Sequence, residues 1–206
     1  AKEGGYRGLF VDTEQYNPKV GPFAWERVDN RMARTPHEYA VQARQRGREA
    51  MTAVNEVYPD IHMRWFFGYA ANGAARPRTT PYAFVPDFID GMVDVAGPDC
   101  RIIDGYEQSY GYKTEASFQD ARALIKDQMR QTSPDPGRFD AVHRAGFGIW
   151  MDCHGLPLGW DPASFLSNYY TPEEFEYTLH QALRYTDEYV WLWFERGSLL
   201  TGSNVP

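Results

Sequence analysis

The chain has 206 residues, which suffices for one well-buried domain and is short for two, so we expect a single domain over residues 1–206. Its 43% hydrophobic and 24% charged residues are ordinary for a globular protein and exclude a disordered or fibrous chain. The net charge of -7 argues against a nucleic-acid partner, because a phosphate backbone is bound by a cationic surface.

Five short apolar runs, rich in aromatic or β-branched residues, alternate with segments of helical periodicity. The first helix is predicted to begin at Thr35, which is followed by a proline and a capping-box acid, Glu38. Thr171 starts the last predicted helix with the same signal. Two further helices are predicted at about 86–95 and 114–130. The strands are predicted at residues 8–12, 61–67, 101–104, 147–152 and 189–194.

This alternation predicts parallel strands, because each crossover places a helix against a face of the sheet. The expected fold class is α/β, in the form of a parallel (β/α) barrel with about five β/α units. A complete TIM barrel needs about 250 residues, so we interpret the chain as a partial TIM barrel, the carboxyl-terminal part of one. Such a partial barrel leaves two unpaired sheet edges, and a homo-oligomer is one way to cover them.

Acidic residues stand at the carboxyl ends of four of these strands, where parallel α/β proteins bind ligands. Glycoside cleavage needs such a group, with one acid to protonate the leaving oxygen and one carboxylate to act as nucleophile or to activate water. Any one acid alone is explained as well by a helix cap or an ion pair, but their recurrence favours a site. The acids concerned are Asp12, Glu14, Asp104, Glu107, Asp152 and Glu195.

Aromatic residues make up 16% of the chain, and many follow the predicted strands. An aromatic inside a strand is usually core, whereas one at a strand end can stack on the apolar face of a sugar ring. The residues predicted to bind substrate are Asp12, Tyr16, Trp25, Tyr69, Asp104, Tyr106, Tyr110, Trp150, His154 and Trp193.

Two alternatives remain open. His154 follows Asp152 by two residues and could form a metal-dependent hydrolase site with His62, His143 or Glu107, although no pair has the spacing of a known zinc signature. The chain could also be a carbohydrate-binding barrel fragment without a competent acid pair. No phosphate loop, dinucleotide fingerprint or nucleophile motif is present, so we expect neither a cofactor nor a metal.

A local resemblance supports the hydrolase interpretation. Residues 8–14, GLFVDTE, resemble the fourth-strand motif of family 18 chitinase-like barrels, in which a glycine precedes alternating acids that end in the catalytic glutamate. The resemblance spans only these seven residues, and Arg7 and Phe10 stand where that family has Asp or Asn. It implies that Glu14 is the catalytic acid.

A broader resemblance is to retaining barrel glycosidases, whose proton donor ends the fourth strand and whose nucleophile ends the seventh. A tryptophan near the end of the last strand is frequent there, and residues 190–195 look similar. If the five strands correspond to the fourth to the eighth, the resemblance implies that Glu14 is the donor and Asp152 the nucleophile. Because these barrels generally use glutamate as nucleophile, Glu107 and Glu195 also stay candidates.

We therefore expect a glycoside hydrolase that acts on a carbohydrate, with Glu14 as general acid and Glu107, Asp152 or Glu195 as nucleophile or base. Asp12 would tune the pKa of Glu14 through its charge. No stretch approaches the roughly 20 apolar residues of a membrane span, so no membrane partner is expected. The sequence opens at Ala1 rather than methionine, so export after removal of a signal is one interpretation, and the location stays open.

Overall fold

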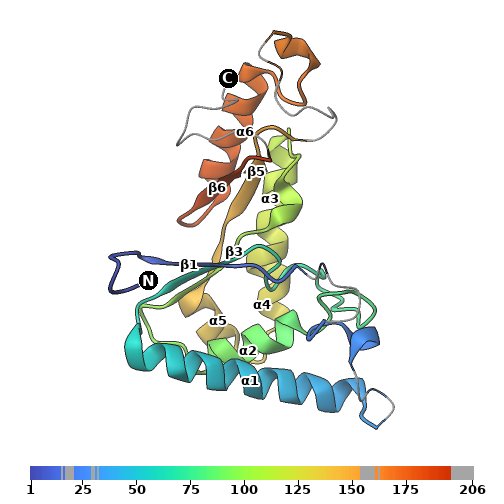
Figure 1. Ribbon diagram of the computed structural model, residues 1–206, viewed down its shortest axis with the longest axis vertical. Helices are drawn as coiled ribbons and strands as arrows, with labels where there is room; N and C mark the ends of the chain where they lie inside the picture. The colour runs from blue at the N-terminus through green and yellow to red at the C-terminus, as the bar shows by residue number, and fades with distance from the viewer. Residues whose placement is uncertain are drawn as a thin grey trace.

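The computed structural model describes residues 1–14, 16, 21–28, 31, 33–153, 161 and 163–195, and the structural statements below concern these residues. They form a mixed α/β fold with two parallel sheets, one of four strands in the order β1-β2-β3-β4 and one that pairs β5 with β6 (Figure 1). The strands are β1 (Gly8–Val11), β2 (His62–Trp65), β3 (Arg101–Asp104), β4 (His143–Ala145), β5 (Phe147–Trp150) and β6 (Val190–Trp193). The helices are α1 (Pro36–Val57), α2 (Val85–Val95), α3 (Glu115–Ala123), α4 (Met129–Thr132), α5 (Pro136–Val142) and α6 (Pro172–Tyr185).

All the strand pairings are parallel, as the alternation of strands and helices predicts. Gly8 lies opposite His62, which in turn lies opposite Arg101, so the carboxyl ends of β1, β2 and β3 meet at one edge of the sheet. The barrel expected from the sequence is not shown. Within the described residues β1, β4, β5 and β6 each pair on one side only, so both sheets stay open.

The chain connects the two sheets through β4 and β5, which are separated by one residue, and the sequence did not predict β4. Gly146 separates β4 from β5, and its N–H donates to the Asp104 carbonyl at 2.7 Å. A Cβ at position 146 would lie 2.9 Å from a methyl carbon of Ile103, so a side chain there would displace its neighbours. The chain therefore passes from the first sheet to the second at a crowded position that favours glycine.

The two predicted capping signals are confirmed. The Thr35 side chain accepts the Glu38 N–H, and the Glu38 carboxylate accepts the Thr35 N–H, so a capping box begins α1. Thr171 and Glu174 do the same for α6. These reciprocal bonds satisfy backbone donors that the first helical turn leaves unpaired.

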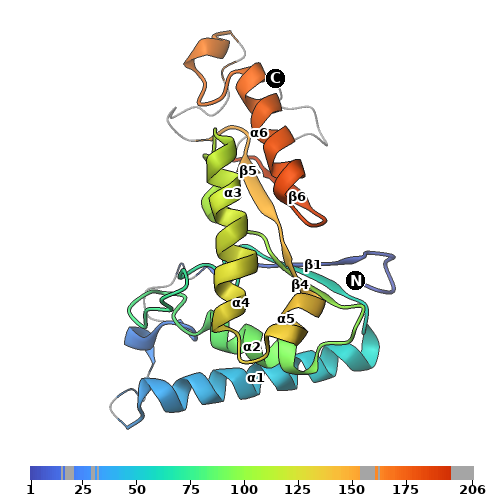
Figure 2. The same cartoon turned by 180° about the vertical axis from the view of Figure 1, so that it is seen from behind.

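The helix predicted at 114–130 has the right extent but is not uniform. A π-helical turn, Leu124–Gln128, separates α3 from α4. The three segments form one continuous column that runs beside both sheets (Figure 2). α5 follows the column and was also missed, because its seven residues show too little of the helical period.

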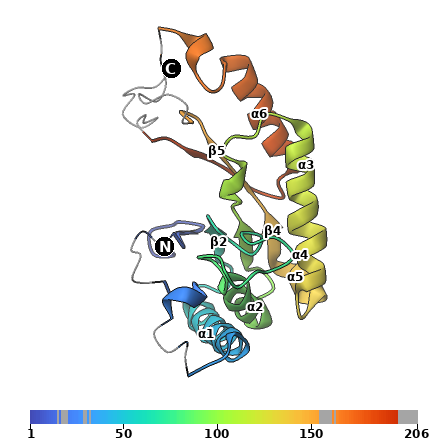
Figure 3. The same ribbon diagram turned by 90° about the vertical axis from the view of Figure 1, so that its right-hand side faces the viewer.

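Helices cover one side of the strands. α1 and α2 pack below the first sheet, α4 lies beside β4, and α3 and α6 lie along one side of β5 (Figure 3). Buried residues of both sheets, including Ile102, Phe147 and Ile149, join helix residues such as Ile89 and Phe118 in one hydrophobic core. The described helices include none long and apolar enough to cross a membrane.

Candidate functional site

A cleft of about 270 Å³ opens at the carboxyl ends of the strands. Both sheets contribute to it, because β1, β2 and β3 end on one side of the cleft and β5 and β6 on the other. The lining residues are Asp12, Glu14 and Tyr16 after β1, Phe66 after β2, Glu107 and Tyr110 after β3, Trp150 at the end of β5, and Trp193 and Glu195 at the end of β6. All of these except Phe66 are residues that the sequence predicted for the site.

The indole of Trp191 supports the cleft from β6. Its ring stacks on Phe66 with centroids 4.5 Å apart, and its Nε1–H donates to the Gly105 carbonyl at 2.8 Å. A Cβ at Gly148 would come within 2.6 Å of the same indole, so glycine leaves the space that the ring occupies. The sequence analysis did not select Phe66 or Trp191 for the site, although Trp191 shares the strand face of Trp193.

Glu14 is held beside Asp12 at the end of β1. The Glu14 N–H donates to the Asp12 carboxylate at 2.7 Å, and the hydroxyl of Tyr16 donates to Glu14 Oε2. Burial raises the pKa of Glu14, and the negative charge of Asp12 raises it further. Asp12 thus acts on the pKa of Glu14 through its charge and raises it; the sequence analysis predicted such an influence without a direction.

Glu107 follows β3, just after Tyr106, whose φ of +43° turns the chain sharply. Its Oε2 is buried and has no hydrogen-bond partner within the described residues. Burial and the negative charge of Glu14 raise the pKa of Glu107 to about 7, while a hydrogen bond from Tyr110 opposes the shift. Glu107 therefore exchanges its proton near neutral pH, which suits a general acid or base.

Asp152 does not line the cleft but connects two residues that do. Its Oδ1 accepts the Trp150 Nε1–H at 2.9 Å and the Glu195 N–H at 2.8 Å. With 6% of its surface exposed, it is a buried support rather than an accessible nucleophile. The catalytic role predicted for Asp152 is thus replaced by one that fixes Trp150 and the end of β6.

Asp104 and Tyr69, both predicted to bind substrate, are buried away from the cleft. The Asp104 carboxylate accepts the Ala70 N–H at 2.6 Å, and burial raises its pKa to about 6. The hydroxyl of Tyr69 donates to the carboxylate of Asp90 at 2.5 Å, and the ring is fully buried. These two predictions are corrected, because neither side chain is accessible to a ligand.

Tyr106 and Trp25 also lie outside the lining of the cleft. Tyr106 is buried with its ring edge against Phe147, and Trp25 packs against Tyr39 and Phe84. Both aromatic rings therefore contribute to packing rather than to the cleft, which corrects their predicted role. His154, the remaining candidate, lies outside the described residues.

The histidines proposed as metal partners from the sequence lie in other environments. His62 Nδ1 is 2.8 Å from the hydroxyl of Tyr189, and His143 is fully buried against Phe139. In the part of the chain that the structure describes, no three His, Cys, Asp or Glu side chains come together as a metal site.

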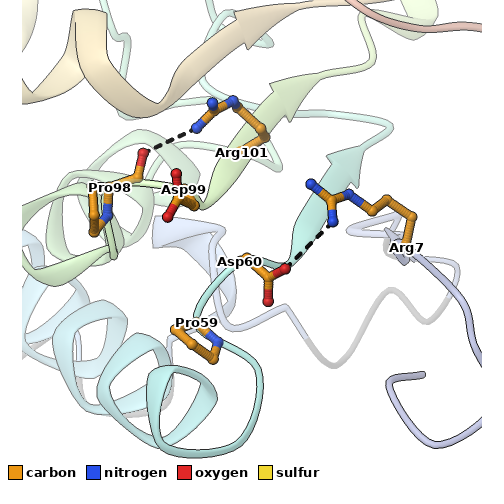
Figure 4. Close-up of a pocket in the computed structure, with 6 residues that line it drawn as sticks. All are labelled: Arg7, Pro59, Asp60, Pro98, Asp99 and Arg101. Atoms are coloured by element: carbon orange, nitrogen blue, oxygen red, sulfur yellow. Dashed lines mark hydrogen bonds and ion pairs between the residues drawn. The ribbon is translucent and has the colours of Figure 1, made fainter.

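A second pocket, of about 350 Å³, lies at the opposite ends of the strands and is lined by Arg7, Pro59, Asp60, Pro98, Asp99 and Arg101 (Figure 4). Arg7 pairs with Asp60 at 3.3 Å, and Arg101 donates to the Pro98 carbonyl at 3.1 Å (Figure 4). Arg7 and Asp60 thus pair within the pocket, whereas the ion-pair partner of Arg101 is Glu188, which lies outside the lining.

Fold and cleft together define an α/β protein with parallel sheets and an acidic, aromatic cleft at the strand ends. No family model, curated protein or solved structure matches the chain.

Proposed function

We propose that the chain is a glycoside hydrolase that cleaves a glycosidic bond with paired carboxylates. One observation carries the proposal. Glu14 and Glu107 follow different strands but line the same cleft, and the charge of Glu14 raises the pKa of Glu107. A glycosidase needs one protonated and one ionised carboxyl group at the same pH, and such a coupling separates their proton affinities.

Glu107 is the better general acid of the two, which reverses the roles predicted from the sequence. With a pKa of about 7 it keeps its proton over much of the acidic and neutral range. Glu14 then serves as nucleophile or as the base that activates water. Asp12 and Glu195 are the other two carboxylates of the lining, and Glu195, on the opposite wall of the cleft, contacts sugar hydroxyls.

The aromatic lining suits a sugar ring. Trp193 is 40% exposed and Tyr16 is 79% exposed, so both offer ring surface to a ligand. Trp150 lines the same cleft, where the Asp152 carboxylate fixes its indole. Sugar rings place their apolar C–H faces on such aromatic surfaces, and the neighbouring carboxylates accept their hydroxyl groups.

We also propose that the strands belong to a (β/α) barrel. Within the first sheet β2, β3 and β4 each pair next to their predecessor in the chain, β6 likewise pairs with β5, and the cleft lies at the carboxyl ends. This is the order and the site position of that fold. The aligned carboxyl ends of β1 and β3 bring Glu14 and Glu107 to the same cleft.

Glu107→Gln and Glu14→Gln test the function on a panel of glycans of varied linkage. Each variant is expected to lose about 10²- to 10⁴-fold in kcat, because each removes a proton transfer or a nucleophile. Glu49→Gln, which changes an exposed acid on α1, is the matched control and should keep full activity. The wild-type kcat/KM should fall above about pH 7, where Glu107 loses its proton.

Unchanged hydrolysis by both cleft variants would overturn the proposal. If the wild type binds glycans in the panel but cleaves none, the non-catalytic alternative is favoured instead. Loss of hydrolysis after dialysis against a chelator, restored by added metal, would favour the metal-dependent alternative.

A further inference from the structure

Glu107 belongs to a short segment that contacts both walls of the cleft. Its own N–H donates to the Phe66 carbonyl at 3.2 Å, which connects it to the end of β2 in the first sheet. Three residues later, the Tyr110 carbonyl accepts the Trp150 N–H at 3.3 Å, which connects the segment to β5. The position of Glu107 therefore depends on contacts with both sheets.

Ser109 makes the central contact with β5. Its side chain is fully buried, and its Oγ accepts the Gly148 N–H at 3.0 Å. The hydroxyl proton has two acceptors within reach, the Gly148 carbonyl at 2.8 Å and the Tyr106 carbonyl at 2.7 Å. One serine side chain thus faces both the backbone donor and the backbone acceptor of Gly148, as a neighbouring strand would do.

The edge of β5 is suited to such a contact. Within the described residues β5 pairs with β6 alone, so its other edge has no strand partner. Backbone N–H and C=O groups that are buried without a partner cost free energy, which a serine hydroxyl avoids here. A Cβ on Gly148 would lie 3.0 Å from a ring carbon of Tyr110, so glycine lets the segment approach β5 closely.

Tyr170 holds the same segment from the side of α6. Its ring is fully buried, and its hydroxyl lies 2.8 Å from the Tyr110 carbonyl and 3.0 Å from the Tyr112 carbonyl. The hydroxyl of Thr178 on α6 also donates to the Tyr112 carbonyl, at 3.1 Å. Residues 109–112 are therefore bound through their main chain or a buried side chain to β5, to α6 and to the residue that precedes α6.

The environment of Glu107 depends on where this segment lies. Burial and the charges of Glu14 and Asp12 raise the pKa of Glu107 to about 7, and a hydrogen bond from Tyr110 opposes the shift. If the segment left β5, the carboxyl group would gain water and move relative to these charges. Its pKa would then fall, because hydration favours the ionised form.

We propose that Ser109 is a positioning residue, which takes the place of a strand on the edge of β5 and thereby holds Glu107 in the cleft. This inference rests on the proposed function, because it adds a residue on which that reaction depends. Ser109 does not line the cleft and acts through Glu107. Proton transfer needs such placement, since a displacement of about 1 Å can lower a rate by about 10²-fold.

Ser109→Ala in the whole chain tests the proposal by two measurements. The first is titration of Glu107 by NMR with ¹³C-labelled glutamate carboxyl groups, assigned through Glu107→Gln. The pKa should fall from about 7 toward 4.5, so that the carboxyl group becomes about ten-fold more acidic. The second is hydrolysis, in which kcat at pH 6 should fall by about ten-fold with little change in KM, and the alkaline limb of the pH profile should move to lower pH.

Tyr170→Phe is a second test, which applies even if Ser109→Ala does not fold. It removes the hydroxyl that bonds the same segment and keeps the shape of the ring, so both measurements should change in the same direction by about three-fold. Two matched controls should leave both measurements unchanged. Ser133→Ala removes a buried hydroxyl between α4 and α5, and Tyr58→Phe removes one that donates to the Tyr6 carbonyl.

A wild-type pKa of Glu107 in Ser109→Ala, or in Tyr170→Phe if the first variant does not fold, would overturn the inference. So would a lower kcat with an unchanged pH profile, because Ser109 would then support the fold without positioning Glu107. The titration needs no substrate and therefore separates this inference from the proposed function. If the wild type cleaves no glycan while the variants lower the pKa of Glu107, the hydrolase fails and the role of Ser109 stands.

Discussion

Glu107 links the chemistry of the cleft to the stability of the fold. Its pKa rises from 4.5 to about 7 on folding, so the folded state binds the proton more tightly, and stability falls as pH increases through that window. Glu107→Gln removes this fall in stability, because glutamine does not ionise. At pH 8 the variant should exceed the wild type in free energy of unfolding by about 1 kcal/mol, a value reduced by solvent screening of a partly exposed group.

Urea unfolding at pH 8 and pH 4 measures this difference, which should vanish at pH 4, where Glu107 is protonated in the folded state. Glu49→Gln serves as the control at both pH values. A Glu107→Gln variant that is less stable than the wild type at pH 8 would show that the carboxylate is satisfied in the cleft.

His143 predicts the opposite pH response. The ring is fully buried without a hydrogen-bond partner for either nitrogen within the described residues, and burial lowers its pKa to about 3. The unfolded chain takes up the proton near pH 6.5 while the folded state does not, so stability falls as pH decreases below about 6.5. Between pH 7 and pH 5 the free energy of unfolding should therefore fall by about 2 kcal/mol less in His143→Leu than in the wild type.

The same unfolding experiment, repeated at the two pH values, measures this effect. His180→Leu, which changes a histidine on α6 rather than one in the core, is the control and should keep the wild-type pH dependence. If His143→Leu also keeps the wild-type pH dependence, another group causes the loss of stability at low pH.

Much of the candidate site could be predicted from the sequence at the residue scale, because side chains that alternate along a strand share one face. Asp12, Glu14 and Glu195 lie in the cleft for that reason. The pattern could not separate Asp152 from them, since burial and hydrogen-bond partners depend on the packing of other segments. It also gave no measure of the pKa of Glu107, which depends on long-range contacts.

At the scale of elements, α1 and α2 cross with their backbones in close contact. A Cβ on Gly47 would lie 1.9 Å from the Phe88 carbonyl oxygen, and one on Gly91 would lie 1.8 Å from that of Arg44. Replacing either glycine by alanine forces the helices apart and should cost about 3 kcal/mol of unfolding free energy.

Thermal or urea unfolding of Gly47→Ala and Gly91→Ala checks this cost. Gly137→Ala is the matched control, because a Cβ there meets only Asp135 Oδ1 at 3.5 Å in α5. That variant should be as stable as the wild type or slightly more stable, since alanine favours a helix. Wild-type stability in Gly91→Ala would contradict the close crossing.

Local signals predicted the elements best where they were strong. The capping boxes at Thr35 and Thr171 fix helix starts by hydrogen bonds within four residues, so they can be read without tertiary information. β4 has only three residues and depends on pairing with β3, which a local pattern does not reveal. The π-helical turn at Leu124–Gln128 likewise leaves the apolar period almost unchanged and is invisible in the sequence.

At the scale of the whole molecule, the outer edges of β1 and β6 have no strand partner among the described residues and are available for association. Leu9 and Phe10 on β1 are 47% and 48% exposed, which is unusual for apolar strand residues. We expect the chain to form a homo-oligomer that covers these edges, as predicted from the sequence. Leu9→Lys should shift the equilibrium between oligomer and monomer toward the monomer, because it places a charge on the β1 edge.

Sedimentation velocity over a range of concentrations measures the association. Val41→Lys adds the same charge at an exposed apolar position on α1 and should leave the oligomer intact. If the wild-type chain is monomeric at all concentrations, the strand edges are not covered by self-association.

The junction at Gly146 has a consequence for selectivity. Glu14 and Glu107 follow strands of the first sheet, whereas Trp193 and Glu195 end the second, so the two walls of the cleft belong to sheets that the chain connects through this residue. We expect a larger residue at position 146 to shift one wall relative to the other, because its Cβ would lie 2.9 Å from a methyl carbon of Ile103. Such a change would alter the size of ligand that is accepted without altering any group that lines the cleft.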